Sequence, residues 1–435
     1  MKLQIEKMVY GGAGLAHPTE GKGAAGAVFV PFTLPGELVE ARLTEKKSAH
    51  EEASLLNVLS ASEDRTTPGC KHFGECGGCH YQHANYTAQV NVKTAILQDT
   101  LEHVGLTVLP KIQPRVGEQW GYRNRTRLRV EEIEGTLRVG YNQRGSNQFL
   151  AIQECPILAP LLWHAAEALL TIGADNSTVG RWARTMSEAE FFTTADEKKL
   201  QMSVFIQKKN QPGFSQFCDS MKQHVPELTG AGSSLIPPKS PQRQVQKPRP
   251  LEDWGAKGLT YQTTREDYWV GRGNFFQVNR FLVEQLITIV TEGRRGQLAW
   301  DLYAGVGLFS KQLAKEFQQV VAVEAAGTDL TNSFRGPGKL AVEATTVEFL
   351  RNAVVQRERP ELIVMDPPRA GVGAEVCSFL ARIAAPEIIY VSCDPITLAR
   401  DLKMLAQAGY NIVELHLVDL FPQTFHLETV VILRR

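Results

Sequence analysis

The sequence contains no hydrophobic run long enough to cross a membrane, no excess of charge of one sign, and few cysteines. Lysine and arginine number 47, and aspartate and glutamate also number 47, so the formal net charge is zero. This balance excludes a chain coated in positive charge but allows a local basic surface. The N-terminal stretch MKLQIEKMVYGG has no apolar segment of signal-peptide length. We therefore expect a cytoplasmic protein without membrane contact.

The seven cysteines are odd in number and partly clustered, which indicates metal binding or catalysis before disulfides in a cytoplasmic protein. Cys70, Cys76 and Cys79 lie in the glycine-rich sequence CKHFGECGGC, whose backbone can wrap closely around a metal. Cys155, in a Cys-Pro pair at the end of a strand pattern, is the best candidate for a fourth ligand. Four thiolates suit zinc or an iron–sulfur cluster, and spacing alone does not separate the two.

The length of 435 residues predicts two or three globular domains. Residues 1–60 alternate short β-like runs with Gly and Pro, which predicts a small barrel of the OB type. Such barrels often bind RNA, although a passive β module would give the same pattern. Residues 61–265 are expected to form a central α+β domain, with a helix over 84–104 and a flexible loop, rich in Pro, Ser and basic residues, over 229–250. Residues 266–435 have the pattern of a nucleotide-binding α/β domain.

The sequence GYRNRTRLRV carries four arginines at period two: Arg123, Arg125, Arg127 and Arg129. On a strand, all four side chains would project from one face, where they must repel one another or meet anions. We favour contact with the phosphates of an RNA backbone, with Tyr122 as a candidate stacking neighbour. The alternative is a solvated face neutralised by Glu131 and Glu132.

The C-terminal block begins with a strand, a glycine turn and a helix. A strand over 297–303 leads to Gly305 and Gly307, a helix is expected over 308–317, and a second strand ends in Glu324. Glycines at such a turn allow a ligand to approach the backbone closely. An acid about 20 residues further on can bind ribose hydroxyls. The pattern therefore predicts a nucleotide-like ligand at this turn.

The same turn distinguishes between ligands. A dinucleotide fingerprint would have a further glycine where Ser310 stands. The motif DLYAGVG, which begins at Asp301, instead fits S-adenosyl-L-methionine, which has no pyrophosphate to bind. A third strand over 361–365 and a closing hairpin of strands 415–420 and 429–433 complete the pattern of the domain.

The sequence SCDP follows the apolar run 388–391 and precedes a helix expected over 396–405, so Cys393 lies where a buried strand gives way to a helix. Ligands bind at this carboxyl edge of an open α/β sheet. A thiol there can gain thiolate character from the helix N-terminus and attack an electrophilic carbon. The alternative is a small buried hydrophobe, which is what most free cysteines are and what we expect of Cys218 and Cys377.

Taken together, these segments resemble the RNA (uracil-5-)-methyltransferase family over nearly the whole chain. The N-terminal barrel resembles a TRAM domain, and CKHFGECGGCHYQH resembles the family's cluster-binding segment. The motifs YRNRTRLRV, ECPIL, FFQVN, DLYAGVG, MDPPR, SCDP and HLETV follow in the family's order. The resemblance implies a Rossmann-like class I methyltransferase domain at the C-terminus. It also implies a [4Fe-4S] cluster on Cys70, Cys76, Cys79 and Cys155.

The resemblance further implies roles for single residues of the C-terminal domain. It implies Cys393 as nucleophile and Glu428 as base, although Glu428 taken alone would be interpreted as a surface acid. Four residues are implied to contact S-adenosyl-L-methionine or frame its pocket: Gln277, Tyr303, Glu324 and Asp366. The segment 325–350 departs from the family because it is shorter and interrupted by Gly-Pro-Gly, and Glu343 is its candidate for an adenine-side contact.

The expected reaction transfers a methyl group from S-adenosyl-L-methionine to C5 of a uridine. Cys393 would add to C6, C5 of the resulting enolate would take the methyl group, and Glu428 would remove the C5 proton. The target base has to leave its stack to reach such a pocket. Asp394, next to the thiol, should oppose thiolate formation.

The RNA substrate is the open part of the prediction. Cluster-bearing relatives favour large-subunit (23S) ribosomal RNA, and tRNA is the alternative. Two rival functions are a catalytically silent RNA-binding or assembly factor and a methyltransferase of DNA cytosine, which also uses a cysteine attack at C6. Nothing in the sequence requires more than a monomer.

Overall fold

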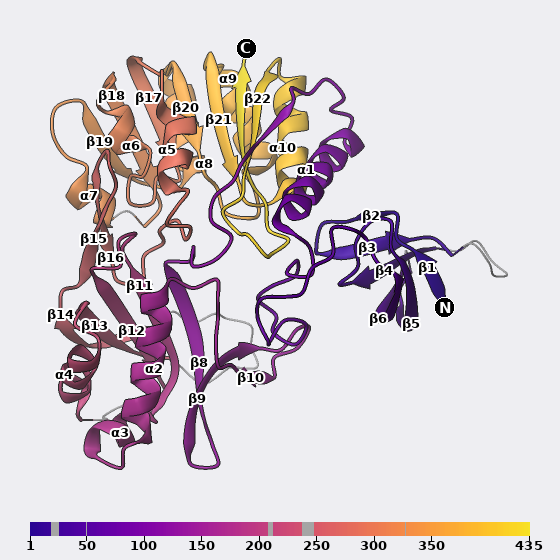
Figure 1. The fold of residues 1–435 in the computed structure, drawn as a ribbon. Helices are drawn as coiled ribbons and strands as arrows, with labels where there is room; N and C mark the ends of the chain where they lie inside the picture. Colours follow the sequence, from indigo (N-terminus) through magenta and orange to yellow (C-terminus); the bar gives the residue numbers. More distant parts are fainter. Residues whose placement is uncertain (19–25, 49, 208–211, 237–247, 327) are drawn as a thin grey trace.

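A computed structural model describes residues 1–18, 26–48, 50–207, 212–236, 248–326 and 328–435. Within them the chain forms a six-stranded, a seven-stranded, a two-stranded and an eight-stranded sheet. Figure 1 shows the N-terminal sheet in indigo to one side, the central sheet below and the C-terminal sheet above. No helix in this described part is both long and apolar enough to cross a membrane.

The N-terminal sheet has the strand order β1-β5-β6-β4-β3-β2. Its strands are β1 Lys2–Gln4, β2 Lys7–Met8, β3 Ala13–Ala16, β4 Ala27–Pro31, β5 Leu38–Lys46 and β6 His50–Ser60. In β3 and β4, buried and less buried residues alternate, because successive side chains of a strand point to opposite faces. One face therefore encloses a small core of its own, which includes Leu3, Val28, Val30 and Val39.

The central sheet has the order β10-β9-β8-β11-β12-β13-β14. Its strands are β8 Arg125–Ile133, β9 Thr136–Asn142, β10 Phe149–Ala151, β11 Met186–Thr193, β12 Leu200–Ile206, β13 Leu228–Leu235 and β14 Arg249–Gly255. The helices α2 Pro160–Ala174, α3 Thr178–Ala183 and α4 Phe214–His224 share one apolar core with this sheet. Cys218 is fully buried in that core, as expected of a structural cysteine.

The prediction of a loop over 229–250 is wrong at both of its ends. Residues 228–235 form β13 and residues 249–255 form β14, and the two strands pair antiparallel. The remainder of the predicted loop, 237–247, lies outside the described residues. The small residues of this segment serve close packing, because a Cβ on Gly230 would lie 2.0 Å from the Ala256 carbonyl oxygen. Their composition was therefore misinterpreted as a loop signal.

The C-terminal sheet has the order β19-β18-β17-β20-β21-β23-β22-β7. Its strands are β17 Gly296–Leu302, β18 Phe317–Glu324, β19 Lys339–Glu343, β20 Leu362–Met365, β21 Glu387–Ser392, β22 Asn411–Val418, β23 Glu428–Arg434 and β7 Ile112–Arg115. The strands from β19 to β21 are parallel, and β23 is antiparallel to both its neighbours. The predicted strands and closing hairpin of this domain are confirmed.

Helices cover both faces of the C-terminal sheet. The helices of this domain are α5 Val283–Thr291, α6 Ser310–Leu313, α7 Thr328–Ser333, α8 Thr346–Gln356, α9 Gly373–Ile383 and α10 Pro395–Gln407. Two apolar cores result, one shared with α8, α9 and α10 and the other with α5, α6 and α7. Cys377 is buried in the first core, again as expected of a structural cysteine.

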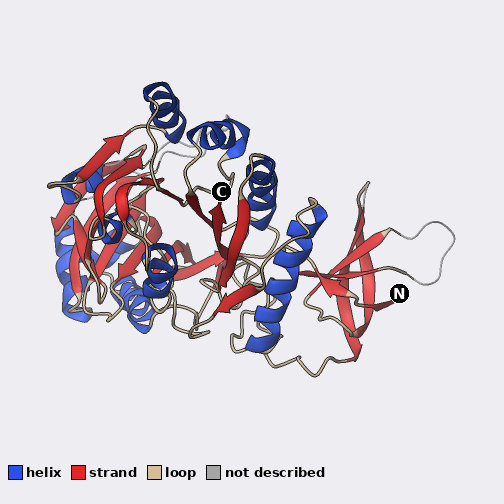
Figure 2. Ribbon diagram, turned by 90° about the horizontal axis from the view of Figure 1, so that it is seen from above, coloured by secondary structure: helices blue, strands red, loops and turns tan. Residues whose placement is uncertain are grey.

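Two segments from the first third of the chain also belong to this C-terminal body. Helix α1 Tyr86–His103 buries Ile96, Leu97 and Leu101 in the same core as α10, and β7 pairs in parallel with β22. Figure 2, seen from above, shows α1 as the long helix between the N-terminal sheet and the rest of the molecule. A hairpin of β15 Gly258–Gln262 and β16 Asp267–Gly271 precedes the C-terminal sheet. The C-terminal body is thus larger than residues 266–435.

Candidate active site

The register of two antiparallel strands brings the predicted nucleophile and base together. Ser392, the last residue of β21, pairs with Thr429 of β23. The residues one step beyond this pair are Cys393 and Glu428, which therefore lie across from one another at the carboxyl edge of the parallel strands. Glu428 is 3% exposed, whereas Cys393 is half-buried and its sulfur is not sealed in the core.

The strand order places the other predicted residues in a row along the same edge. From β19 to β23, the strand ends and the turns that follow them carry Glu343, Glu324, Tyr303, Asp366, Cys393 and Glu428. Asp366 stands between the two groups, because β20 lies between β17 and β21. The edge thus divides into a region around Glu324 and a region around Cys393. Both lie where ligands bind in open α/β sheets.

Burial, followed by the charges of the Glu428 and Asp366 carboxylates, raises the pKa of the Cys393 thiol to about 11. Arg369 acts in the opposite direction, and Asp394 adds a smaller rise. The thiol of the free protein is therefore protonated at neutral pH. The opposition expected from Asp394 is present, and the thiolate character expected from the helix N-terminus stays a prediction.

The base candidate lies in an equally unusual environment. Burial raises the pKa of Glu428 well above its usual range, and the charge of Asp366 adds to the rise. Burial and the charge of Asp301 in turn raise the pKa of Asp366. A hydrogen bond from Gln277 Nε2 to Asp366 Oδ2 (3.3 Å) acts in the opposite direction and lowers this pKa. Carboxyl groups whose pKa values are raised in this way can exchange protons near neutral pH, which is the property that acid–base catalysis needs.

Arg369 is a functional candidate that the sequence reasoning missed. Its guanidinium lowers the pKa of both Cys393 and Glu428, and its Nη2 lies 3.4 Å from His426 Nδ1. Burial lowers the pKa of His426 to about 4, so this ring is neutral and can accept the hydrogen bond. The available signal was a cation directly after Asp-Pro-Pro at a strand end, one strand from the nucleophile.

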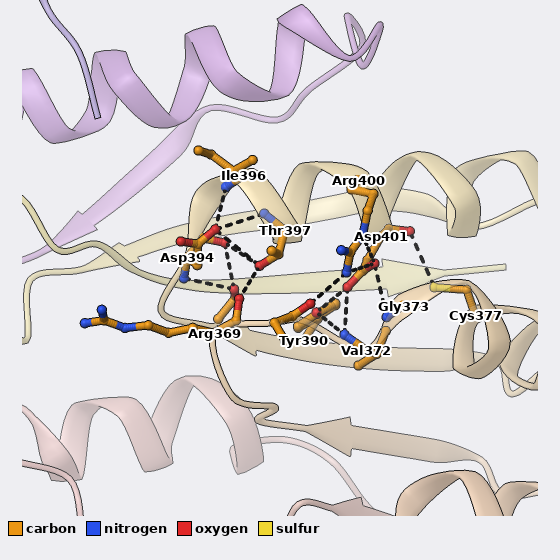
Figure 3. Close-up of polar contacts among 12 residues, drawn as sticks. Arg369, Val372, Gly373, Cys377, Tyr390, Asp394, Ile396, Thr397, Arg400 and Asp401 are labelled. Carbon is orange, nitrogen blue, oxygen red and sulfur yellow. Dashed lines mark hydrogen bonds and ion pairs between the residues drawn. The ribbon is translucent and has the colours of Figure 1, made fainter. Parts of the chain in front are cut away.

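The turn that carries Cys393 is fixed by the start of α10 (Figure 3). Asp394 caps this helix, because its Oδ1 accepts hydrogen bonds from Ile396 N (3.0 Å) and Thr397 N (2.9 Å). The Thr397 hydroxyl donates in turn to the Arg369 carbonyl oxygen (2.9 Å). The nucleophile turn and the Arg369 loop are therefore held together.

A second set of hydrogen bonds lies one helical turn further along α10, at Asp401, whose side chain is fully buried. Its carboxylate accepts hydrogen bonds from Tyr390 Oη (2.8 Å), Val372 N (2.8 Å) and Arg400 Nε (2.9 Å), as Figure 3 shows. These donors come from β21, from the loop after Arg369 and from α10 itself. The network orients α10 against the sheet and so defines the position of Cys393.

The turn after β17 has the features expected of a ligand-binding loop. Gly305 and Gly307 have positive φ values of 56° and 86°, and Gly305 N donates to Glu324 Oε2 at 3.0 Å. The Asp301 carboxylate, fully buried, accepts from the backbone N (2.8 Å) and the hydroxyl of Ser310. Ser310 therefore stabilises the turn in place of a glycine. The helix predicted over 308–317 is only α6, because the turn extends to residue 309.

Three further residues flank this loop. Tyr303 is half-buried and adopts a left-handed backbone conformation (φ 63°), which costs a non-glycine residue on the order of 1 kcal/mol. Gln277 is 5% exposed and donates to Asp366. Glu343 ends β19 in register with Glu324, so the shortened segment 325–350 still supplies an acidic strand end.

The loop that leads to Glu428 is held by a buried ion pair. Lys93 Nζ of α1 contacts Asp419 Oδ1 (2.5 Å) and donates to the Phe421 carbonyl oxygen (2.9 Å), and both charged side chains are almost fully buried. Gln89, one turn earlier, exchanges two hydrogen bonds of 2.9 Å with Gln423. Helix α1 therefore fixes the segment that delivers the candidate base.

We predict that Lys93→Met destabilises the protein by about 3–5 kcal/mol, because it leaves Asp419 buried without its partner. The free energy of unfolding, measured by urea denaturation, tests this. The matched control is Lys7→Met, since Lys7 forms an exposed ion pair with Asp99 (2.6 Å) whose loss should cost less than about 1 kcal/mol. Equal effects of the two substitutions would contradict the importance of the buried pair.

The four cysteines predicted as metal ligands line one cavity of about 1220 Å³ beneath the central sheet: Cys70, Cys76, Cys79 and Cys155. Burial, followed by the charges of the other three, raises the pKa of Cys155 to about 12. The sulfurs are thus near enough to influence one another. Within the described residues, however, no three His, Cys, Asp or Glu side chains converge in the way that a single metal ion requires.

The arginine side chains of β8 lie against carboxylates, and of the two glutamates in the alternative interpretation Glu131 is one of these partners. Arg127 pairs with Glu188 and Arg129 with Glu131, while Arg125 lies 3.8 Å from the carboxylate of Glu190. Arg123 precedes β8 and is not part of that strand. Tyr122 is fully buried, and its hydroxyl donates to the Pro422 carbonyl oxygen (3.0 Å), so the prediction that it stacks on RNA is wrong.

The doubly covered sheet and the acidic row along its carboxyl edge define a methyltransferase of the class that uses S-adenosyl-L-methionine. Residues 338–435 match the tRNA (Uracil-5-)-methyltransferase family. The 23S rRNA (uracil(1939)-C(5))-methyltransferase RlmD of Chromohalobacter salexigens is 31% identical, covering 100% of this chain and 89% of its own. The chain belongs to the RNA (uracil-5-)-methyltransferase family, and the resemblance drawn from its motifs is confirmed.

Two further comparisons cover the whole chain. An RNA methyltransferase of Aquifex aeolicus is 30% identical over 100% of this chain and 98% of its own. The crystal structure of Pyrococcus abyssi tRNA (uracil-54, C5)-methyltransferase in complex with S-adenosyl-L-homocysteine is 22% identical, with a TM-score of 0.75 and 100% of both chains covered. This second likeness confirms the mixed α/β methyltransferase fold.

Proposed function

We propose that this protein transfers the methyl group of S-adenosyl-L-methionine to C5 of a uridine in RNA, with Cys393 as nucleophile and Glu428 as base. The observation that carries the proposal is the position of these two residues across from each other, Cys393 directly after β21 and Glu428 at the start of β23, with the charge of Asp366 acting on both. Relatives named as 23S rRNA methyltransferases are 30–31% identical to this chain, against 22% for the tRNA enzyme, which favours ribosomal RNA over tRNA.

The chemistry begins at the sulfur. The Cys393 thiolate forms a bond to C6 of an extruded uracil, and the electrons of the C5–C6 double bond move toward the C4 carbonyl to give an enolate. Bound S-adenosyl-L-methionine supplies the electrophilic methyl group that C5 of this enolate attacks. Glu428 then takes the C5 proton, the double bond reforms, and the Cys393 thiolate leaves as it entered. Arg369 favours the ionised forms of both side chains.

We predict that the reaction accelerates with pH through and above the neutral range. Cys393 and Glu428 both have raised pKa values in the free protein and both act in their deprotonated forms, so each unit of pH increases the competent fraction. The measurement is kcat/KM for RNA between pH 6 and about 10 at constant ionic strength. A rate that falls over this range would contradict the assigned roles.

The donor site is proposed at the other half of the edge. The Glu324 carboxylate, which already accepts from Gly305 N, is placed to bind ribose hydroxyls, and Gly307 lets the ligand approach the backbone. Gln277, Tyr303 and Asp366 would form the side toward Cys393. In this arrangement the donor methyl would lie between the two regions of the row, next to the uracil ring that receives it.

We further propose that the cavity below the central sheet holds a [4Fe-4S] cluster on Cys70, Cys76, Cys79 and Cys155. The support is that all four cysteines line one cavity and that the charges of Cys79, Cys76 and Cys70 act on Cys155, so four thiolates could serve one metal centre. The cluster would supply a structural crosslink for the central domain. Anaerobically purified protein should be brown and contain about four irons per chain; colourless, zinc-loaded, active protein would contradict the assignment.

The remaining surfaces are proposed to hold the RNA around the target base. The N-terminal sheet would act as a TRAM barrel. Of the arginines, Arg123, Arg127 and Arg129 line the cysteine cavity. The ion pairs of Arg127 and Arg129 with glutamates would have to open for phosphate contact. The overall function is tested by mapping 5-methyluridine in ribosomal and transfer RNA from cells with and without the gene. Loss of the modification at one ribosomal uridine is expected, and unchanged maps of both RNAs would overturn the proposal.

A further inference from the structure

The N-terminal sheet contacts the catalytic region through the turn between β2 and β3. Val9 N donates to the Ala13 carbonyl oxygen (2.9 Å), and Gly12 closes the turn at a φ of 91°. A Cβ on Gly12 would lie 3.2 Å from His80 Cβ, so the turn packs closely on the loop after the cysteine cluster. This tight turn projects Tyr10 toward the C-terminal body.

Tyr10 contacts both segments that carry the proposed catalytic groups. Its hydroxyl donates to Asp394 Oδ2 at 3.2 Å, next to the nucleophile. Its ring meets Phe425 edge-on, with centroids 5.4 Å apart and an interplanar angle of 89°. Phe425 packs on His426, with centroids 4.3 Å apart, two residues before Glu428. One side chain of the N-terminal sheet therefore touches the nucleophile turn and the base loop together.

The contact completes the set of donors around Asp394. The Oδ1 atom of this carboxylate accepts from the backbone of Ile396 and Thr397, and Oδ2 accepts from Tyr10. Burial and the charge of Asp394 raise the pKa of Tyr10, so its hydroxyl remains a donor throughout the working range. A hydrogen-bond donor on Oδ2 disperses part of the negative charge of the Asp394 carboxylate. The effect of that charge on the neighbouring Cys393 is therefore smaller.

We propose that Tyr10 is a positioning residue for the nucleophile, which fixes the turn of Cys393 and reduces the effect of the Asp394 carboxylate on its sulfur. The N-terminal sheet then completes the active site as well as binding RNA. This inference rests on the proposed role of Cys393. The charged groups that act on the sulfur come from each element around it: Glu428, Asp366, Arg369 and Asp394.

The substitution Tyr10→Phe keeps the ring on Phe425 and removes the donor. The measurement is the rate of Cys393 alkylation by iodoacetamide against pH, read at this residue by mass spectrometry, without RNA or S-adenosyl-L-methionine. We expect about three- to tenfold slower alkylation at pH 8 and an upward shift of the midpoint, since one hydrogen bond to a charged group is lost. Methyl transfer should lose the same factor in kcat with little change in KM for RNA.

Two variants make the test specific. Tyr410→Phe removes another hydroxyl donor, to the Ala385 carbonyl oxygen (2.9 Å), and should leave the alkylation of Cys393 unchanged. Asp394→Asn keeps a helix cap but removes the charge, so adding Tyr10→Phe to it should shift the midpoint no further. The proposal is overturned if Tyr10→Phe shifts the alkylation midpoint equally in the presence of Asp394 and of Asp394→Asn. It is also overturned if Tyr10→Phe alone causes no shift. An alkylation shift in a protein that transfers no methyl group would retain the Tyr10 contact and reject the proposed function.

Discussion

Replacing Cys393 with alanine is expected to abolish methyl transfer to RNA. In the proposed mechanism the sulfur provides the covalent bond that makes C5 of uracil nucleophilic, and the other groups described in the row carry no thiol to replace it. We predict a loss of at least about 10⁴-fold in kcat, equivalent to about 5 kcal/mol of transition-state stabilisation. The measurement is transfer of labelled methyl groups to a uridine-containing RNA transcript, with S-adenosyl-L-methionine affinity determined in parallel by calorimetry. That affinity should change little, because Cys393 lies outside the proposed donor site.

The matched control is Cys377→Ala. Cys377 is 4% exposed and packs in the core between α9 and the sheet, so its loss should lower stability but leave the turnover of the folded protein intact. Retained turnover in Cys393→Ala would reject the nucleophile. If the wild-type protein neither binds S-adenosyl-L-methionine nor methylates RNA, the result would instead support the rival function of a catalytically silent assembly factor.

The second large effect is expected for Glu428→Gln. An amide cannot take the C5 proton, so the reaction should proceed through methyl transfer and then stop before elimination. We predict a loss of about 10²–10⁴-fold in turnover together with a methylated protein–RNA adduct that survives denaturation. The adduct is measured as a shifted band on a denaturing gel, and its label should come from the methyl donor.

Glu414→Gln is the appropriate control for that substitution. Glu414 lies on β22, next to β23, and contacts His416 away from the proposed reaction. It should neither slow turnover nor accumulate an adduct. If Glu428→Gln turned over normally, the base would have to be another group. If it were inactive without an adduct, Glu428 would act before the methyl group is transferred.

Much of the fold was predictable, because periodicity and turn residues are local signals. The apolar run 388–391 lies in β21, SCDP forms the turn before α10, and FPQTFHL lies in the loop between β22 and β23. The prediction of a loop over 229–250 failed because small residues occur both in loops and in closely packed strands. Gly230 and its neighbours resemble a loop in composition, but their size allows two strands to pair closely against a third segment.

The candidate site was predictable in its residues but not in its electrostatics. Sequence gives Cys393 and Glu428 as separate motifs, whereas their contact depends on the register of β21 and β23. Likewise, no local pattern shows that Lys93 is buried against Asp419, or that Arg369 is the cation acting on both catalytic groups. These features arise from pairings between residues that lie 24 to 326 positions apart in the chain. They are therefore visible only in the folded molecule.

The most direct test is to incubate the wild-type protein with S-adenosyl-L-methionine and an RNA whose uridines carry fluorine at C5. Fluorine cannot leave as a proton does, so the reaction should halt with the pyrimidine bonded to the protein. Digestion and mass spectrometry should locate that bond between C6 of the methylated pyrimidine and the sulfur of Cys393, in a complex stable to denaturation. An adduct on any other residue, or no adduct under conditions in which ordinary RNA is methylated, would contradict covalent catalysis by Cys393.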